Sequence, residues 1–379
     1  MARYLYIHIP FCLKKCTYCD FYSVSDSKFI IGPYMTSLCK ELEMRKAYNG
    51  ELDGIYIGGG TPSILKEKDI ATIMDKVRST CRISAEAEIT SEANPGTLTE
   101  KGTKGMLNAG INRISIGVQS LDDRELSLLG RMHDAAEAIA AFNIARVGGF
   151  GNISLDLIYG IPGQNLDGWK RTLKKIISLC PEHISTYELT PEKNTILYEQ
   201  LEKNRLKLPD EDEVAEMYYT AIDILTEGGY EHYEISNFAL PGLLCRHNLN
   251  YWDRGEYIGI GAGAHSFLAG RRIANVCDVR QYIHDVELGA LPIAEETLLN
   301  YRDEIEETLF LGLRKTDGFD SKLIPADMTE QLKEALDDLS HQGLLDLSRG
   351  HIKLTRKGLI VCNSVIVRLM LCIERIRRA

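Results

Sequence analysis

Short apolar segments alternate with longer segments of helical periodicity through the first 230 residues, and this alternation constrains the fold more than any other feature. The predicted strands are Tyr4–Ile9, Gly54–Ile57, Glu86–Glu92, Arg113–Val118, Ile153–Tyr159 and His183–Leu189. The predicted helices are Tyr34–Tyr48, Glu67–Thr80, Thr99–Ala109, Ala135–Ala145, Leu166–Leu179 and Glu211–Glu227. Such alternation is typical of βαβ units, whose strands form a parallel sheet. Because a closed barrel of this kind needs about eight units, the six units found here predict an α/β fold with a partial (β/α)6 barrel.

The pattern changes after residue 230. Residues Tyr230–Arg272 are rich in Gly, Asn, Tyr and His, and they predict loops with short strands within a loop-rich extension over 231–293. Helical patterns return from about Ala294. The elements predicted there are helices over Asn300–Leu313 and Met328–Gln342, a hairpin of Leu344–Leu347 with His351–Leu354, and a last helix from Arg356. We therefore expect three parts: a partial barrel over 1–230, the extension over 231–293, and a C-terminal helical, winged-helix-like domain over 294–379.

The composition restricts the partners and the compartment of the chain. It has 379 residues with 54 acidic and 44 basic side chains, which argues against broad nucleic-acid binding because that needs a basic surface. The most apolar segment, Gly358–Ile373, is interrupted by Asn363 and Arg368 and falls short of the roughly 18 apolar residues of a spanning helix. The first residues are too polar for a signal peptide. We expect a cytoplasmic protein without a nucleic-acid partner, and peripheral association with a membrane surface stays open.

Three of the ten cysteines form a cluster in the sequence. Cys12, Cys16 and Cys19 have the spacing C-x3-C-x2-C directly after the first predicted strand. A structural zinc site normally has four ligands in C-x2-C pairs, and no fourth ligand completes this set. Three thiolates on one loop can hold three irons of a [4Fe–4S] cluster. The fourth iron then stays open to an external ligand, such as the amino and carboxylate groups of an amino acid.

Glycines and polar residues follow the ends of the other predicted strands. The run Gly58-Gly59-Gly60-Thr61-Pro62-Ser63 follows the second strand, and consecutive glycines let a ligand approach the backbone closely. The polar residues at later strand ends are Glu92, Gln119, Arg131 and Asp156. Each of these residues, taken alone, is equally compatible with a surface salt bridge or a helix cap. Together they predict a polar ligand at the barrel mouth, because buried charges need partners.

The cysteine motif, with Tyr18 before its last cysteine, resembles that of the radical S-adenosylmethionine (SAM) superfamily. The resemblance implies a partial barrel that holds a [4Fe–4S] cluster and SAM at the carboxyl ends of its strands. Cys12, Cys16 and Cys19 would be the metal ligands. The residues implied for SAM binding are Tyr6, Tyr18, Gly59, Gly60, Thr61, Glu92, Gln119, Arg131 and Asp156. We assign no catalytic residue.

A series of further motifs narrows the resemblance. In chain order they are Tyr6-x-His8-x-Pro10-Phe11-Cys12, the glycine run, Glu92-Ala-Asn94-Pro95-Gly96, Gly117-Val-Gln119-Ser120, Gly130-Arg131-x-His133 and Asp156-Leu-Ile-Tyr-Gly160-Ile-Pro162. Together they are similar to the HemN/HemW family, which contains oxygen-independent coproporphyrinogen III dehydrogenases and heme chaperones. The resemblance covers nearly the whole chain. The dehydrogenases carry a fourth cysteine at the position of Phe21 and an N-terminal extension, so both departures put dehydrogenase activity in doubt.

The segment Arg246-His247-Asn248-Leu249-Asn250-Tyr251-Trp252 matches the H-N-x-x-Y-W motif of the heme chaperones. This resemblance implies a heme site in a loop, with His247 as an axial iron ligand and with Tyr251 and Trp252 offering flat faces. Arginines suit the propionates of heme. The further candidates are Arg246, Arg271 and Arg272 for propionates, and Cys245, His232 and His265 as additional iron ligands.

Three functions therefore compete. The first is a heme chaperone that passes heme to acceptor hemoproteins, with a [4Fe–4S] cluster, SAM and heme as its cofactors. The second is an enzyme that oxidatively decarboxylates the propionates of coproporphyrinogen III, in which the cofactor performs the difficult step. The third is radical modification of RNA, against which the acidic charge counts. The chaperone is the function we expect.

Overall fold

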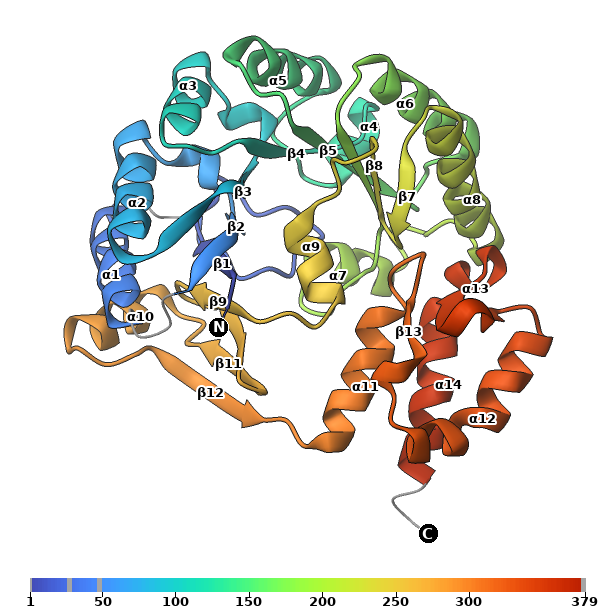
Figure 1. Ribbon diagram of the computed structural model, residues 1–379. Coiled ribbons are helices and arrows are strands. Elements are labelled where there is room, and N and C mark those ends of the chain that lie inside the picture. Colours follow the sequence, from blue (N-terminus) through green and yellow to red (C-terminus); the bar gives the residue numbers. More distant parts are fainter. Residues whose placement is uncertain (1, 26–28, 46–49, 376–379) are drawn as a thin grey trace.

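The computed structural model describes residues 2–25, 29–45 and 50–375. Its centre is a 12-stranded sheet that curves into an open barrel (Figure 1). The parallel strands, in sheet order, are β1 (Tyr4–Ile9), β2 (Glu51–Gly59), β3 (Arg82–Ala93), β4 (Arg113–Gln119), β5 (Ile153–Tyr159) and β6 (His183–Glu188). The helices on the outside of the curve are α1 (Ile31–Met44), α2 (Glu67–Thr80), α3 (Glu100–Asn108), α5 (Ala135–Gly148), α6 (Leu166–Ser178) and α8 (Glu211–Glu227). The predicted partial (β/α)6 barrel is confirmed.

Helix α6 illustrates why these segments fold as they do. Its buried residues Trp169, Thr172, Leu173 and Ile176 recur with the helical spacing and form one apolar stripe toward the sheet. Asn165 begins the helix, because its side chain accepts a hydrogen bond from the backbone N–H of Gly168. The strands alternate: in β1, Leu5, Ile7 and Ile9 are buried apolar residues, whereas Tyr6 and His8 pair with each other inside the barrel.

Further strands extend the sheet at both edges. Beyond β6 lie β8 (Asn237–Ala239) and β7 (Glu231–Glu234), both antiparallel to their neighbours. At the other edge β9 (Tyr257–Ile260) runs parallel to β1. It is followed in the sheet by β10 (His265–Leu268), β11 (Arg271–Asn275) and β12 (Ile293–Leu298). The predicted extension therefore supplies most of the antiparallel edges of the barrel sheet.

Two predictions for this part of the chain are wrong. The helical region expected from Ala294 begins instead with the strand β12, because β11 offers its polar residues a row of backbone partners. The segment expected as loops also forms two helices, α9 (Arg246–Trp252) and α10 (Val279–Glu287). Helix α9 lies inside the curve of the sheet (Figure 1). The end of the first predicted helix, residues 46–48, lies outside the described residues.

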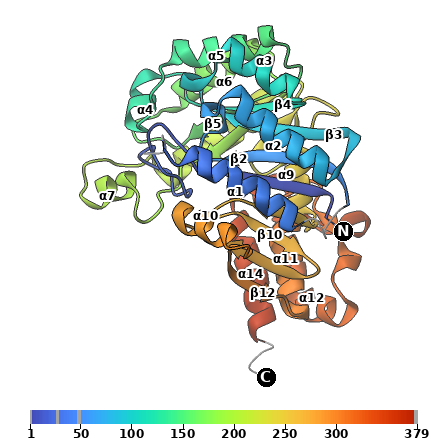
Figure 2. The same ribbon diagram turned by 90° about the vertical axis from the view of Figure 1, so that its left-hand side faces the viewer.

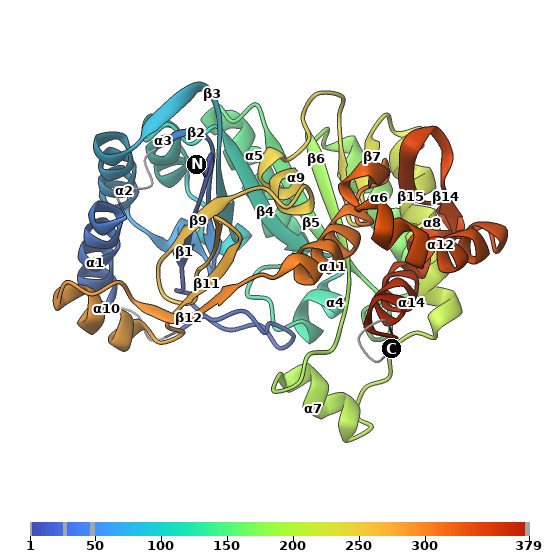
Figure 3. The same ribbon diagram turned by 60° about the horizontal axis from the view of Figure 1, so that its bottom comes forward.

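The C-terminal domain is helical with a small antiparallel sheet, as predicted. Its helices are α11 (Tyr301–Gly312), α12 (Ala326–His341), α13 (Arg356–Ile360) and α14 (Cys362–Arg375). Its strands, in sheet order, are β13 (Phe319–Asp320), β15 (His351–Leu354) and β14 (Leu345–Asp346). The domain lies beside β7 and α8 (Figure 3), where Arg356 forms an ion pair with Asp223 at 2.6 Å. No helix in the described part of the chain has both the length and the apolar character needed to cross a membrane.

Candidate functional site

The carboxyl ends of the parallel strands surround a cavity of about 510 Å³. Most of the site residues predicted from the sequence line it. They are Cys12, Cys16, Tyr18, Cys19, Gly59, Gly60, Thr61, Glu92, Gln119, Arg131 and Asp156. Tyr6 does not line this cavity; its hydroxyl pairs with Nδ1 of His8 at 2.9 Å, and its ring packs on Tyr56 inside the barrel. The structure thus brings together, in one cavity, residues that lie far apart in the sequence.

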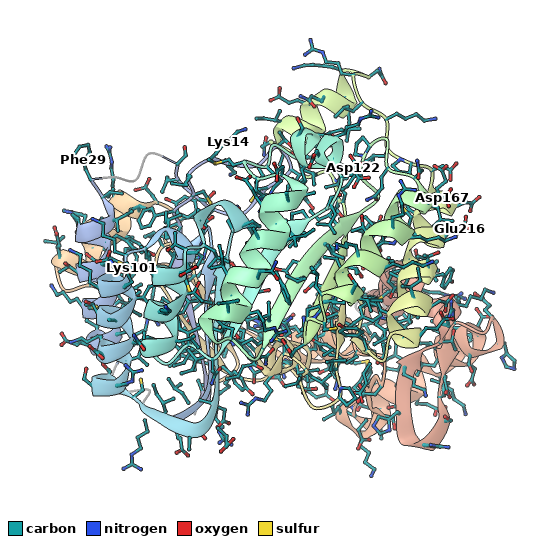
Figure 4. The ribbon with its side chains drawn as sticks, turned by 90° about the horizontal axis from the view of Figure 1, so that it is seen from above. Lys14, Phe29, Lys101, Asp122, Asp167 and Glu216 are labelled. Carbon is teal, nitrogen blue, oxygen red and sulfur yellow. The ribbon has the colours of Figure 1, made fainter. Side chains whose placement is uncertain are left out.

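The cysteine loop is held by Thr17. Its backbone N–H donates to the carbonyl of Leu129 at 3.1 Å, and its hydroxyl donates to the carbonyl of Leu128 at 2.9 Å. Its own carbonyl accepts from the N–H of Leu197 at 2.8 Å. The loop is therefore fixed between α4 (Asp123–Leu128) and α7 (Ile196–Glu202), two helices on the same side of the barrel (Figure 2). Figure 4 shows Lys14 of this loop and Asp122 at the start of α4 on the same side of the molecule.

The three cysteines of the loop are free thiols, partly buried at the cavity wall. Thr61 donates its hydroxyl to Sγ of Cys12 at 3.5 Å, and Arg131 donates Nη1 to Sγ of Cys16 at 3.4 Å. Burial raises the pKa of Cys19 to about 11, because a thiolate loses its hydration there. A bound metal centre reverses this effect by stabilising the thiolate. Among the described residues no three His, Cys, Asp or Glu side chains are placed to share one metal ion; in an iron–sulfur cluster each thiolate has its own iron.

The glycine run at the end of β2 makes room for two neighbouring side chains. A Cβ atom at Gly58 would lie 2.8 Å from the carboxyl carbon of Glu92. Gly59 has a φ of 106°, and a Cβ atom there would meet the ring of His8 at 2.3 Å. The N–H of Gly59 donates to Oε2 of Glu92 at 2.9 Å. These glycines therefore place Glu92 at the cavity as well as keeping the backbone close to it.

Two partly buried carboxyl groups face the cavity. Burial raises the pKa of Glu92 to about 7, although hydrogen bonds from Gly59 and from the hydroxyl of Tyr56 (3.0 Å) oppose the shift. Burial also raises the pKa of Asp156, although it accepts hydrogen bonds from the hydroxyls of Ser185 at 2.7 Å and Ser115 at 2.9 Å. The negative charge of Asp156 further disfavours ionisation of Glu92. A cationic ligand between them would favour both carboxylates.

Arg131 presents a buried donor to the same cavity. Its Nη2 donates to the carbonyl of Gly117 at 2.6 Å, whereas its buried Nε has no hydrogen-bond partner. Burial acts to lower the pKa of Arg131, but Tyr18 and Cys16 raise it overall, so the guanidinium remains charged. An unpartnered buried donor on a cation is well suited to an anionic ligand such as a carboxylate.

Gln119 reaches the cavity through strained backbone. It has a φ of 67°, in the left-handed region that side-chain-bearing residues rarely adopt. The pairing of β4 with β5 shifts register between Gly117 and Gln119, and such a bulge re-aims a side chain. A Cβ atom at Gly117 would lie 2.7 Å from Nε2 of Gln119, so a larger residue there would displace the Gln119 side chain. Strain of this kind is typical of functional sites.

The residues predicted to bind heme lie outside this cavity. His247 is on α9 rather than in a loop, which corrects the sequence-based expectation, and it is only 2% exposed. Its Nε2 pairs with the hydroxyl of Tyr251 at 2.8 Å, and burial lowers its pKa to about 3. Trp252 lies instead beneath Arg314 of the C-terminal domain, 5.7 Å from the guanidinium carbon to the ring centre. His247 and Tyr251 thus contact each other, while Trp252 faces another direction.

The other heme candidates do not gather around His247. Arg271 forms an ion pair with Glu296, and Arg272 forms one with Glu307. The remaining candidates are placed as follows: Arg246 donates to the carbonyl of Glu86, His232 stacks on Phe238, His265 begins β10 at the surface, and Cys245 is fully buried. The arginines proposed for propionates therefore already have protein partners in this conformation.

Sequence reasoning missed several residues that line the cavity. They are Tyr56, Ser115, Tyr187, Glu188 and Glu192, among others. Tyr56 is notable because it lines the cavity and also stacks on His247, with ring centres 4.9 Å apart. Its place two residues before the glycine run is the only signal in the sequence that could have indicated it.

Comparisons with known proteins agree with this architecture. Residues 6–176 match the family model "Radical SAM superfamily", and residues 299–361 match "HemN C-terminal domain". The heme chaperone HemW of Bacillus subtilis is 38% identical over 95% of this chain and 97% of its own. HemW of Escherichia coli is 43% identical over 69% of each chain.

The solved structure of coproporphyrinogen III oxidase (HemN) from Escherichia coli superimposes with a TM-score of 0.85. The alignment covers 97% of this chain and 90% of that one, at 24% identity, and it therefore shows a shared fold. The full-length similarity to HemW proteins goes further than a shared fold. The chain belongs to the HemW family of the radical SAM superfamily.

Proposed function

We propose that this protein is a heme chaperone, which binds heme and transfers it to acceptor hemoproteins, and that it carries a [4Fe–4S] cluster and SAM in the barrel cavity. The observation that carries the proposal is that proteins named as heme chaperones align with 95% and 97% of the chain. The geometry of the cavity supports the proposed binding of the cluster and SAM. The placement of His247 on the short helix α9 supports the proposed binding of heme.

Cys12, Cys16 and Cys19 would hold the cluster, because they are free thiols on one loop that is fixed at the cavity wall. A bound cluster and SAM supply one-electron chemistry that side chains lack. The unpartnered Nε of Arg131 suits the carboxylate of SAM, and the buried Glu92 suits its ammonium. One ligand that carries both a carboxylate and an ammonium would complement these two groups, which is why we propose an amino acid-like ligand here.

His247 would be the iron ligand for heme. Its pKa of about 3 keeps the imidazole neutral at physiological pH, which is the form that binds iron. Its Nδ1 is buried and has no hydrogen-bond partner. Tyr251 and Trp252 on the same helix would add aromatic surface for a flat macrocycle. Because His247 is buried, heme uptake on this proposal requires α9 to move.

Phe21 argues for the chaperone over the dehydrogenase. It stands where the dehydrogenases carry a fourth cysteine, and here its side chain is 67% exposed at the rim of the cavity. A phenyl ring offers no metal ligand and no acid or base. The structural likeness to HemN at 24% identity speaks for the fold alone.

The decisive experiment is a hemin titration of the anaerobically reconstituted protein. We expect wild type to develop a Soret band that is shifted or weakened in His247→Ala. A matched control is His284→Ala, which removes an exposed imidazole from α10, and it should behave as wild type. Equal heme uptake by wild type and His247→Ala would remove His247 as the ligand. Turnover of coproporphyrinogen III with SAM and a reductant would overturn the chaperone proposal.

A further inference from the structure

Helix α9 holds His247, the proposed iron ligand, in a buried position, which we call the closed position of the helix. The Nε2 of His247 is occupied by the hydroxyl of Tyr251, and its ring face is covered by Tyr56. Two ring nitrogens on this helix, Nδ1 of His247 and Nε1 of Trp252, are buried without any hydrogen-bond partner. Unpartnered buried donors and acceptors are uncommon and disfavour the packing in which they occur. In the closed position of α9, the rings of His247 and Trp252 therefore each keep one nitrogen without a hydrogen-bond partner.

One carboxylate holds the backbone of the first turn of α9 to the barrel, in addition to the bond from the Arg246 side chain to the carbonyl of Glu86. Oε1 of Glu88, on β3, accepts hydrogen bonds from the backbone N–H of Arg246 at 3.1 Å and of His247 at 3.4 Å. It also accepts from Sγ of Cys245 at 3.7 Å. Amides in the first turn of a helix have no partner within the helix, and a carboxylate there is favourable. Glu88 is only 7% exposed, so water competes little for these bonds.

Arg113 is close enough to this carboxylate to interact with it electrostatically. Burial acts to lower the pKa of Arg113, but the nearby Cys245 and Glu88 raise it above its usual value. The buried guanidinium and the buried carboxylate therefore support each other.

The other end of α9 is held more weakly. Asp253, next to the helix end, pairs with Lys315 at 2.6 Å, and Arg254 pairs with Glu307 at 2.9 Å. Both pairs are partly exposed and join the helix end to the C-terminal domain. Such partly exposed ion pairs contribute less than a buried, hydrogen-bonded carboxylate. Release of the Glu88 contact is thus the step that would let α9 move.

We propose that Glu88 is a positioning residue that latches α9 closed, and that heme uptake proceeds through release of this latch so that His247 reaches the iron. The inference rests on the proposed heme-binding function. It assigns to Glu88 a role that its place on β3, away from the cavity, does not suggest. Opening of the latch exposes Cys245, which is 0% exposed in the closed position, so this thiol reports on the state of the helix.

The first test measures N-ethylmaleimide labelling of Cys245 by peptide mass spectrometry. We expect labelling to be several-fold faster in Glu88→Gln than in wild type. Cys362, a thiol 6% exposed in the C-terminal domain, serves as an internal control and should not change. Glu86→Gln alters an exposed carboxylate on the same strand and should label as wild type. Equal labelling of Cys245 in Glu88→Gln and wild type would refute the latch.

The second test measures the rate of hemin association by stopped-flow absorbance in the Soret region. We expect Glu88→Gln to bind several-fold faster than wild type, and the gain to disappear in Glu88→Gln combined with His247→Ala. If Glu88→Gln instead loosened the whole fold, the faster hemin association would persist in the double variant. If Glu88→Gln does not fold, the test uses the wild-type protein with and without hemin. We then expect N-ethylmaleimide to label Cys245 faster when hemin is bound. Equal labelling rates with and without hemin would overturn the proposal. If heme binding does not depend on His247, the proposed heme-binding function is wrong. The labelling of Cys245 in the absence of heme still tests the latch in that case.

Discussion

Glu92 gives the cavity a pH dependence. Its pKa is raised from 4.5 to about 7, chiefly by burial. The folded chain therefore keeps a proton that the unfolded chain releases between these two values. The stabilising contribution is fully present below about pH 4.5 and is lost as the pH rises through about 7. At about 1.4 kcal/mol for each pKa unit, the loss amounts to about 3 kcal/mol, as an upper bound because the carboxyl faces a water-accessible cavity.

Glu92→Gln should remove this dependence. The neutral amide avoids the cost of a buried charge, so the variant without cofactors should gain stability relative to wild type as the pH rises from 5 to 8. Urea unfolding of both proteins at several pH values measures the difference. Glu100→Gln, on the exposed surface of α3, is the matched control and should follow wild type. Parallel curves for wild type and Glu92→Gln over this range would refute the assignment of a raised pKa to this carboxyl.

Three further outcomes follow from the site. Cys16→Ala should abolish the cluster, which in wild type should contain about four irons and four sulfides by chemical analysis; a full cluster in the variant would contradict the ligand assignment. Arg131→Lys should weaken SAM binding about tenfold or more in calorimetry, because lysine lacks the planar fork, and unchanged affinity would count against this role. Trp252→Ala should speed the loss of heme to apomyoglobin while leaving the cluster content unchanged, since a flat face is removed; equal loss rates would exclude Trp252 from the heme site.

Sequence patterns were sufficient for the barrel. The predicted bounds of β1, β5, α2 and α8 agree with the structure. These elements have strong local signals, such as uninterrupted apolar strands and a helical stripe that begins at a capping residue. Asp210 before α8 shows this, because its side chain caps the helix that the periodicity predicts. The convergence of residues at strand ends also follows from sequence, because parallel strands all end at the same mouth.

Only the tertiary structure decided the elements whose partners are distant. The strand β12 is exposed and polar, and it is a strand because β11 pairs with it. Helix α9 has seven residues, too few to be stable through local propensity. It forms because Glu88 partners its first amides and because the barrel interior covers His247. A sequence shows that a histidine and two aromatics occur in one motif. The direction of the His247 ring depends on stacking against Tyr56 of β2, and that of Trp252 on contact with Arg314 of the C-terminal domain, which no local pattern encodes.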